Sequence, residues 1–451
     1  MKQLKPITNK LLWIFALGQF GWSLLSGIVS NWMVYYYTGS PDAQNPNTGL
    51  FASGITQEPI LFKLTLFGLV LAAGRIFDAI TDPLIAGWSD RSSYKGGRRI
   101  PFMRAMAIPF SLCTIALFTI PQTASIGLND TLLFVLLMVF YLFMTMFCTP
   151  YNALIAELGD TQQHRINVST FISFTFIVGQ SISFLLPNVA GALEPSVGQY
   201  NSIRFAVAIM SAIACLAMLF PAFYIKERDY IESKPSETKP FASLIRTFSN
   251  VQFRHFVYSD VIYFFALTLF QTGLAFYETK LMGIPDTMTF TLTATMTAIS
   301  VCLYPLVNIL AKKIGKKSLI IIGFFAYSVV FAITSICGEG VHWGFIVAIT
   351  AAVPMAILGI LPQACVADVA ELTRLETGED RSGMFFAART FAFKMGQALA
   401  MVVFTSLTVS KTPQSYRTTA IFAFVTCFIG AVIFFTYNEK QILKSIEAHK
   451  N

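Results

Sequence analysis

Apolar segments of about 20 residues, the length that crosses a lipid bilayer, follow one another along almost the whole chain. We count twelve, over residues 11–37, 63–88, 103–122, 131–155, 166–190, 203–226, 255–280, 289–311, 318–337, 343–367, 383–410 and 417–437. Only 12% of the 451 residues are charged, whereas soluble domains carry about 25%. We therefore expect an all-α membrane protein with twelve transmembrane helices and no soluble domain.

Lysine and arginine are distributed unevenly between the two sides that these segments define. If residue 1 is cytoplasmic, 24 of the 32 Lys and Arg residues fall in cytoplasmic segments. Positive residues close to span ends mark the cytoplasmic side, so we expect both termini in the cytoplasm. The formal net charge of +8 is explained by these short loops and does not indicate a nucleic-acid partner.

A repeat relates the two halves of the chain. PLIAGWSDR at residues 83–91 and PLVNILAKK at residues 305–313 each end an apolar segment and enter a basic loop. The first loop closes with Gly-Arg-Arg at 97–99 and the second with Gly-Lys-Lys at 315–317. Transporters are often built from such repeats. The pattern predicts a six-helix bundle over 1–226, a cytoplasmic middle loop over 227–254, and a second six-helix bundle with a short cytoplasmic tail over 255–451.

The second apolar segment contains Arg75, Asp78 and Asp82. On a helix the two acids lie one turn apart on one face, and Arg75 lies near the same stripe. Charges inside a span are costly and face a cavity or a partner. Two close carboxylates favour binding of a proton or a metal cation, and the Thr81 hydroxyl beside them suits a hard cation. The alternative is a structural Arg75–Asp78 ion pair with Asp82 at a helix end, which leaves one carboxylate unexplained.

Two cations, Arg389 and Lys394, lie within the eleventh apolar segment. At ~1.5 Å per residue, Asp78 and Lys394 are each about 16 Å from the cytoplasmic ends of their spans. Asp82 and Arg389 are each about 9 Å from those ends by the same rise. Each acid could therefore face a cation at its own depth. We expect Lys394 to neutralise the acids when no cation is bound, and to act together with Arg75 in coupling.

These motifs resemble those of a known transporter family. The loop signature of the major facilitator superfamily is matched by Gly87, Asp90, Arg91, Gly97, Arg98 and Arg99. The R-x-x-D-A-x-x-D-P string at 75–83 resembles that of the glycoside–pentoside–hexuronide:cation symporters, the melibiose permease group, and WMVYYYTG at 32–39, VADVAE at 366–371 and Lys394 agree with it. The resemblance implies the major facilitator fold and a cation site at the positions of Asp78, Thr81, Asp82 and Thr145. A D-x-x-x-D-P string is also found in the similar animal lysophospholipid carriers.

The sequence departs from that family at the substrate positions. Ser23, Cys148 and Ser173 stand where the resemblance places charged residues that hold the substrate, so an α-galactoside bound by that scheme is not expected. The other polar residues that could face the same cavity are Gln19, Tyr36, Asn152, Gln180 and Gln271. Such side chains serve equally well as contacts between helices.

Charged residues near the cytoplasmic ends of helices are candidates for gating. They are Asp90, Arg91, Arg98, Arg99, Asp368 and Glu371. Arg389 could contact Asp368 or Glu371 as a latch. It could instead bind the carboxylate of an anionic sugar, because an arginine fork suits a carboxylate. On that interpretation we expect a uronide to be carried better than its neutral counterpart, with a neutral glycoside or pentoside close behind.

These features predict a symporter, coupled to Na⁺ or H⁺, that imports a glycoside, pentoside or hexuronide by alternating access. A carrier of a lysolipid or another amphiphile is the alternative. An intramembrane prenyltransferase would need a second aspartate-rich motif, and Asp368-Val-Ala-Glu371 is a poor one. We expect no enzyme activity, no cofactor and no structural metal. The expected protein is a monomer in the bacterial inner membrane, whose partners are a small solute and the lipid bilayer.

Overall fold

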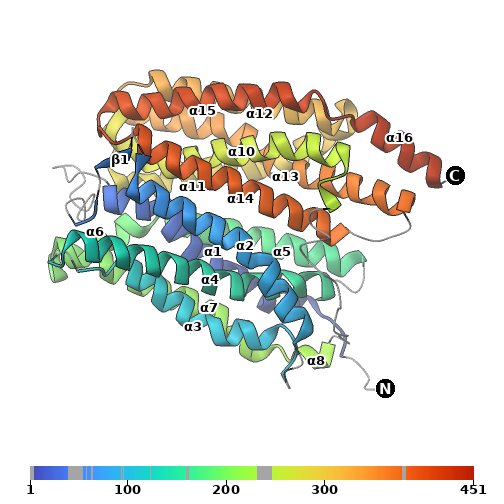
Figure 1. Cartoon of the computed structure of the whole chain (residues 1–451), viewed down its shortest axis with the longest axis horizontal. Helices are drawn as coiled ribbons and strands as arrows, with labels where there is room; N and C mark the ends of the chain where they lie inside the picture. Colours follow the sequence, from blue (N-terminus) through green and yellow to red (C-terminus); the bar gives the residue numbers. More distant parts are fainter. Residues whose placement is uncertain are drawn as a thin grey trace. The chain divides into compact units, whose positions relative to one another are not determined.

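The computed structural model describes residues 5–38, 54–56, 58–61, 64–92, 94, 96–121, 123–158, 162–230, 246–377 and 382–450. Helices make up nearly all of these residues (Figure 1). Two short strands, β1 (Pro59–Leu61) and β2 (Leu64–Thr65), form an antiparallel pair. The all-α class expected from the sequence is confirmed.

The chain divides into two compact units. The first consists of Met1–Gln57 and Ile80–Lys239, and the second of Glu58–Ala79 and Pro240–Asn451. This division differs from the sequence-based halves in one segment, because the first half of α2 (Leu66–Arg91) belongs with the second unit. Within that unit, Gly68 of α2 lies so close to Thr405 of α14 (Ser382–Leu407) that a side chain at Gly68 would collide with it.

Besides the end of α2, the first unit contains α1 (Asn9–Thr38), α3 (Ile100–Leu117), α4 (Ile126–Leu158), α5 (Gln162–Ser183), α6 (Leu186–Val197), α7 (Gln199–Tyr224) and α8 (Glu227–Tyr230). Helix α1 packs against α5 and α7, and α3 packs against α4 and α7. Helix α3 has Pro101 in its first turn, where the missing N–H has no helical partner to lose.

Besides α14 and the start of α2, the second unit contains α10 (Val251–Phe276), the π-helical turn η1 (Tyr277–Leu281), the 3₁₀ turn η2 (Asp286–Met288), α11 (Thr289–Ile314), α12 (Lys316–Ile336), α13 (Val341–Thr377), α15 (Pro413–Phe434) and α16 (Glu439–Lys450). The Asn250 side chain caps α10 by accepting from Phe253 N at 3.0 Å. The Thr412 hydroxyl caps α15 by accepting from Ser415 N at 3.3 Å.

The two units share one packing plan. Helix α1 packs against α5 and α7 as α10 packs against α14 and α15. Helix α3 packs against α4 and α7 as α12 packs against α13 and α15. The corresponding helices come in the same order along each half, so the repeat read from the basic loops is also a repeat of the packing.

Ten helices of the described residues are long and apolar enough to cross a membrane, and the pair α5 and α6, bent by 41° at its break, would make eleven. Helix α2 is not among them because Arg75, Asp78 and Asp82 interrupt its apolar run. The count of twelve spans and the cytoplasmic location of the termini stay predictions.

The close approach of α1 to α5 depends on Gly179. A Cβ atom at Gly179 would lie 2.7 Å from the Phe20 carbonyl oxygen, which is backbone and cannot rotate away. We therefore expect Gly179→Ala to lower the free energy of unfolding by about 1–3 kcal/mol. Gly127→Ala on α4 is the matched control, because nothing lies within 4 Å of a Cβ atom there. Thermal unfolding in detergent measures both variants, and equal melting temperatures would contradict the expectation.

Candidate functional site

Helices α2 and α14 bring an acid and a base together inside the second unit. Lys394 Nζ lies 2.8 Å from Asp78 Oδ2, and the two side chains are 11% and 1% exposed. In such a dry environment each charge is stable because the other is there, and removing one leaves the other uncompensated. A cation that reaches Asp78 must therefore compete with Lys394.

The next turn of α2 belongs to the first unit and carries Thr81 and Asp82. The Thr81 hydroxyl lies 3.5 Å from the Thr145 hydroxyl of α4. Thr149 Oγ1, one turn further along α4, donates to Asp82 Oδ1 at 3.3 Å. One face of α4 thus lines this turn with hydroxyl oxygens, which are ligands that hard cations accept. Sequence reasoning missed Thr149, although its spacing of four residues from Thr145 was a usable signal.

Arg389 of α14 is paired inside the second unit with Asp260 of α10. Its Nε and Nη2 donate to the two carboxylate oxygens at 2.8 and 2.9 Å. Both residues are buried, and the guanidinium lies 5.8 Å from the ring of Phe256 and 5.6 Å from that of Phe264. The arginine fork is therefore filled by a carboxylate of the chain itself. Sequence reasoning missed Asp260, although it is one of only two acids within the apolar segment 255–280.

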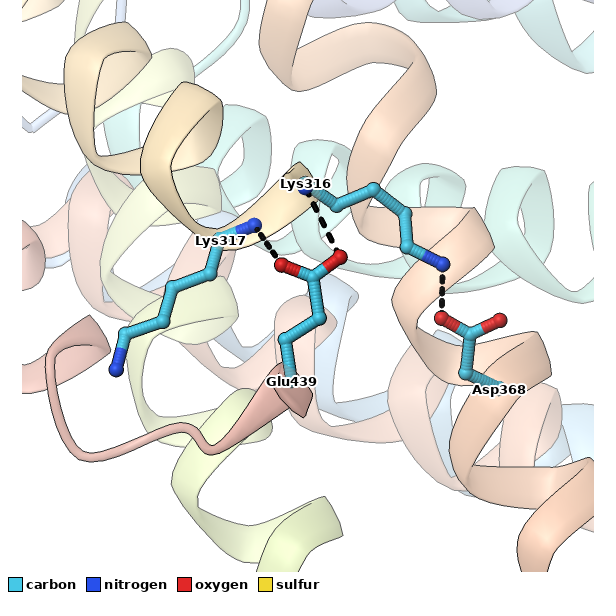
Figure 2. Close-up of polar contacts among 4 residues, drawn as sticks. All are labelled: Lys316, Lys317, Asp368 and Glu439. Atoms are coloured by element: carbon cyan, nitrogen blue, oxygen red, sulfur yellow. Dashed lines mark hydrogen bonds and ion pairs between the residues drawn. The ribbon is translucent and has the colours of Figure 1, made fainter. Parts of the chain in front are cut away.

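Asp368 and Glu371 of α13, the expected latch partners of Arg389, have other partners. Lys316 of α12 forms an ion pair with Asp368 (Figure 2). Arg374 Nε and Nη2 donate to the two Glu371 carboxylate oxygens at 2.9 and 2.8 Å. The expected latch is thus corrected, because Asp260 holds Arg389 in their place.

The basic loop of the first unit ends against a buried glutamate. Glu227 accepts from the backbone N–H groups of Arg98, Arg99 and Ile100 at 2.8, 2.8 and 3.0 Å. These amides begin α3, where N–H groups have no helical acceptor and the helix dipole stabilises a negative charge. Gly97, with φ of 122°, permits the approach, because a Cβ atom there would lie 2.6 Å from the Glu227 carboxyl carbon.

Helix α8 also holds two neighbouring segments. Asp229 accepts from Lys5 Nζ at 2.7 Å, and this hydrogen bond raises the pKa of Lys5. Arg228 Nη2 donates to the Tyr94 carbonyl oxygen at 2.9 Å. The short helix therefore joins the start of the chain, the loop after α2 and the start of α3.

The predicted gating residues of the first unit occupy different settings. Arg99 is buried and donates from Nη1 to the Ser89 hydroxyl of α2 at 3.1 Å. Arg98 is half-buried, and Arg91 is exposed at the end of α2. Asp90 belongs to α2, but its side chain lies outside the described residues.

The second unit repeats the glutamate contact of the first. Glu439, the first residue of α16, accepts from the backbone N–H groups of Lys316 and Lys317 at 2.9 and 2.8 Å (Figure 2). Gly315, with φ of 86°, precedes them as Gly97 precedes the first pair. Figure 2 shows the Lys316 side chain extending from α12 toward α13, where it meets Asp368. We call the two arrangements the Glu227 clamp and the Glu439 clamp.

The predicted substrate residues differ in exposure. Gln19, Ser23 and Tyr36 are buried, Cys148 and Gln180 are half-buried, and Asn152, Ser173 and Gln271 are exposed. The three buried side chains form hydrogen bonds within the first unit. Gln19 Oε1 accepts from Trp22 Nε1 at 3.1 Å, Ser23 Oγ donates to the Phe20 carbonyl at 3.0 Å, and Tyr36 OH donates to the Phe118 carbonyl at 3.2 Å. The less buried five are the better candidates for contact with a solute.

A comparison with protein families decides the class of the chain. The model of the family described as "MFS/sugar transport protein" matches residues 14–439. The chain belongs to this family. It is thus a multi-pass membrane transporter, and the prenyltransferase alternative is set aside.

Relatives of this MFS/sugar transport family member agree with the assignment. It is 22% identical to the isoprimeverose transporter of Lactiplantibacillus pentosus, over 73% of this chain and 63% of that one. It is 23% identical to sodium-dependent lysophosphatidylcholine symporter 1-A of Danio rerio, over 75% of this chain and 69% of that one. The crystal structure of a mutant of the nucleoside transporter NupG matches with a TM-score of 0.67 at 11% identity, over 96% of this chain and 100% of that one, and supports the fold.

The Arg389–Asp260 pair yields a first prediction for the site. Asp260→Asn should lower the free energy of unfolding by about 3–5 kcal/mol, because it leaves a buried guanidinium without its counter-charge. The double variant Asp260→Asn/Arg389→Gln should lose less than the sum of the two single variants. Asp229→Asn, which breaks the exposed pair with Lys5, is the control and should change little. Chemical unfolding in detergent gives these values, and additive losses would contradict a direct pair.

The two clamps yield a second prediction. Glu227→Gln and Glu439→Gln keep the shape of the side chain and remove the charge that faces the amides of α3 or α12. Each should lower the free energy of unfolding by about 1–2 kcal/mol, as the loss of a helix cap does. Glu447→Gln is the control, because Glu447 is exposed on α16. A melting temperature of either clamp variant equal to that of the control would refute the capping role.

Proposed function

We propose that this protein is a cation-coupled symporter that imports a sugar or sugar derivative by alternating access. The observation that carries the proposal is the buried ion pair of Asp78 and Lys394. A lysine that neutralises an intramembrane acid is a partner that a transported cation can replace. The description of the family as sugar transport proteins supports the class of solute.

Coupling follows from competition for Asp78. When no cation is bound, Lys394 neutralises the acid and holds α14 against the first half of α2. When Na⁺ or H⁺ binds Asp78, the attraction to Lys394 is weakened, and α14 is no longer held to α2 by charge. A ligand shifts a conformational equilibrium only by its difference in affinity for the two states, and this exchange of partners supplies such a difference.

We propose that the cation is bound by the oxygen atoms of Asp78, Thr81, Asp82 and Thr145. The two acids lie one turn apart on α2, and the Thr81 and Thr145 hydroxyls lie 3.5 Å apart. Hydroxyl and carboxylate oxygens together suit Na⁺, whereas H⁺ needs a carboxylate alone. The sodium-dependent relative from Danio rerio also favours Na⁺.

For the solute we propose a neutral glycoside or pentoside ahead of a hexuronide. Asp260 occupies the Nε and Nη2 face of Arg389, so this face of the guanidinium is closed to a sugar carboxylate. The isoprimeverose transporter among the relatives favours a glycoside. A lysolipid is the second candidate, because one relative is named for lysophosphatidylcholine.

The test is uptake into proteoliposomes. Asp78→Asn should abolish accumulation of the solute above the external concentration, because the cation can then no longer displace Lys394 from a carboxylate at position 78, while exchange of solute across the membrane persists. Asp229→Asn is the control and should accumulate solute like the wild type. Neutral glycosides, uronides and lysolipids are compared with and without Na⁺. Accumulation by Asp78→Asn at the wild-type level would refute coupling through this acid.

A further inference from the structure

Another buried acid of the second unit lies outside helices α2 and α10. Glu278 is in the π-helical turn η1, which directly follows α10. Its side chain is buried at 3% exposure, and its Oε2 has no hydrogen-bond partner among the described residues. Single π-helical turns are rare and often lie at functional sites, which makes an unpartnered acid in such a turn a feature that needs an explanation.

Two threonines at the start of α11 are the next part of this site. Thr289 and Thr293 are buried, and the hydroxyl oxygen of each also has no hydrogen-bond partner among the described residues. They lie four residues apart, on one face of the first turns of α11. The Thr289 hydroxyl is near enough to Glu278 to interact with its carboxylate, but it does not reach hydrogen-bond geometry. Within the part of the chain that the structure describes, none of these three buried oxygen atoms has a hydrogen bond of ordinary geometry.

A cavity borders two of these three residues. Glu278 and Thr293 line it together with apolar side chains that include Phe270, Leu274 and Met282. The cavity has a volume of about 10 Å³. This is room for about one water molecule or one small ion.

The charge of Glu278 decides between those two occupants. No Lys, Arg or His of the described residues forms an ion pair with it. A water molecule would bond the hydroxyls but would bring no counter-charge, so beside water the buried acid is stable only when protonated, whereas a cation stabilises its ionised form. A cation satisfies the carboxylate and both hydroxyls. With one carboxylate, and no cluster of three acidic, His or Cys residues among the described residues, the site suits a monovalent ion.

We propose that Glu278, Thr289 and Thr293 bind one Na⁺ ion at a second cation site of this protein. The site shares no residue with the acids of α2. Its existence can therefore be tested separately from the proposed coupling through Asp78. It would tie the π-helical turn after α10 to the first turns of α11 whenever Na⁺ is bound.

The test measures equilibrium binding of radioactive Na⁺ to the purified full-length protein, with choline chloride keeping the ionic strength constant. Asp78→Asn is the background, because it removes one of the two carboxylates of the cation site proposed on α2. This variant should keep saturable Na⁺ binding, and Asp78→Asn/Glu278→Gln should lose it. Thr293→Val in the same background should weaken binding about tenfold, the effect of losing one good oxygen ligand.

Thr295→Val is the matched control on α11, because Thr295 is exposed and bonds to the Thr291 carbonyl oxygen at 2.8 Å. It should bind Na⁺ with the affinity of its Asp78→Asn parent. If Glu278→Gln does not fold, the comparison of Thr293→Val with Thr295→Val decides alone. The proposal is overturned if Asp78→Asn binds no Na⁺, if Glu278→Gln leaves the binding unchanged, or if the two threonine variants bind equally.

Discussion

A charge among apolar helices is stable only beside an opposite charge or several polar partners, and α14 is placed by this constraint. Lys394 meets Asp78 of α2, and Arg389 meets Asp260 of α10. The two cations lie five residues apart on one helix and reach acids on two different helices. Apolar contacts tolerate sliding, whereas each of these pairs has one geometry. Any rearrangement of α14 must therefore keep both partners or exchange one of them for a ligand.

The features that sequence reasoning found are those that depend on local pattern. Apolar segment length indicated the helical class, and the spacing of Gly-basic-basic motifs indicated the repeat that the packing also shows. Charges within spans pointed to Asp78 and Lys394, which the structure places in contact. Counting residues along a span gives the depth of a side chain but not the neighbouring helix that it faces. For that reason the sequence gives no indication that Arg389 pairs with Asp260 and not with Asp368 or Glu371.

Other features arise only from the folded chain. Glu278 stands two residues before Lys280 near the end of an apolar segment, where a charged pair is typical of a residue in a loop. The π-helical turn instead places the glutamate in the interior. Glu227 and Glu439 follow the last span of each half, and their role depends on a helix start more than 120 residues earlier in the chain. No local sequence pattern indicates a contact between residues so far apart in the chain. The one related signal is that a glutamate beside a basic residue recurs in both halves.

The two clamps bind backbone amides, and this determines which residues of the repeat can be substituted during evolution. A carboxylate that accepts from backbone N–H groups does not depend on the side chains that those residues carry. The first half accordingly has two arginines after its glycine and the second has two lysines, and in both halves the glutamate accepts from the N–H groups of these two residues. The glycine is different, because its positive φ and the closeness of the glutamate leave no room for a side chain. In this motif the residue without a side chain is the one that cannot be replaced, and the charged residues beside it are free to diverge.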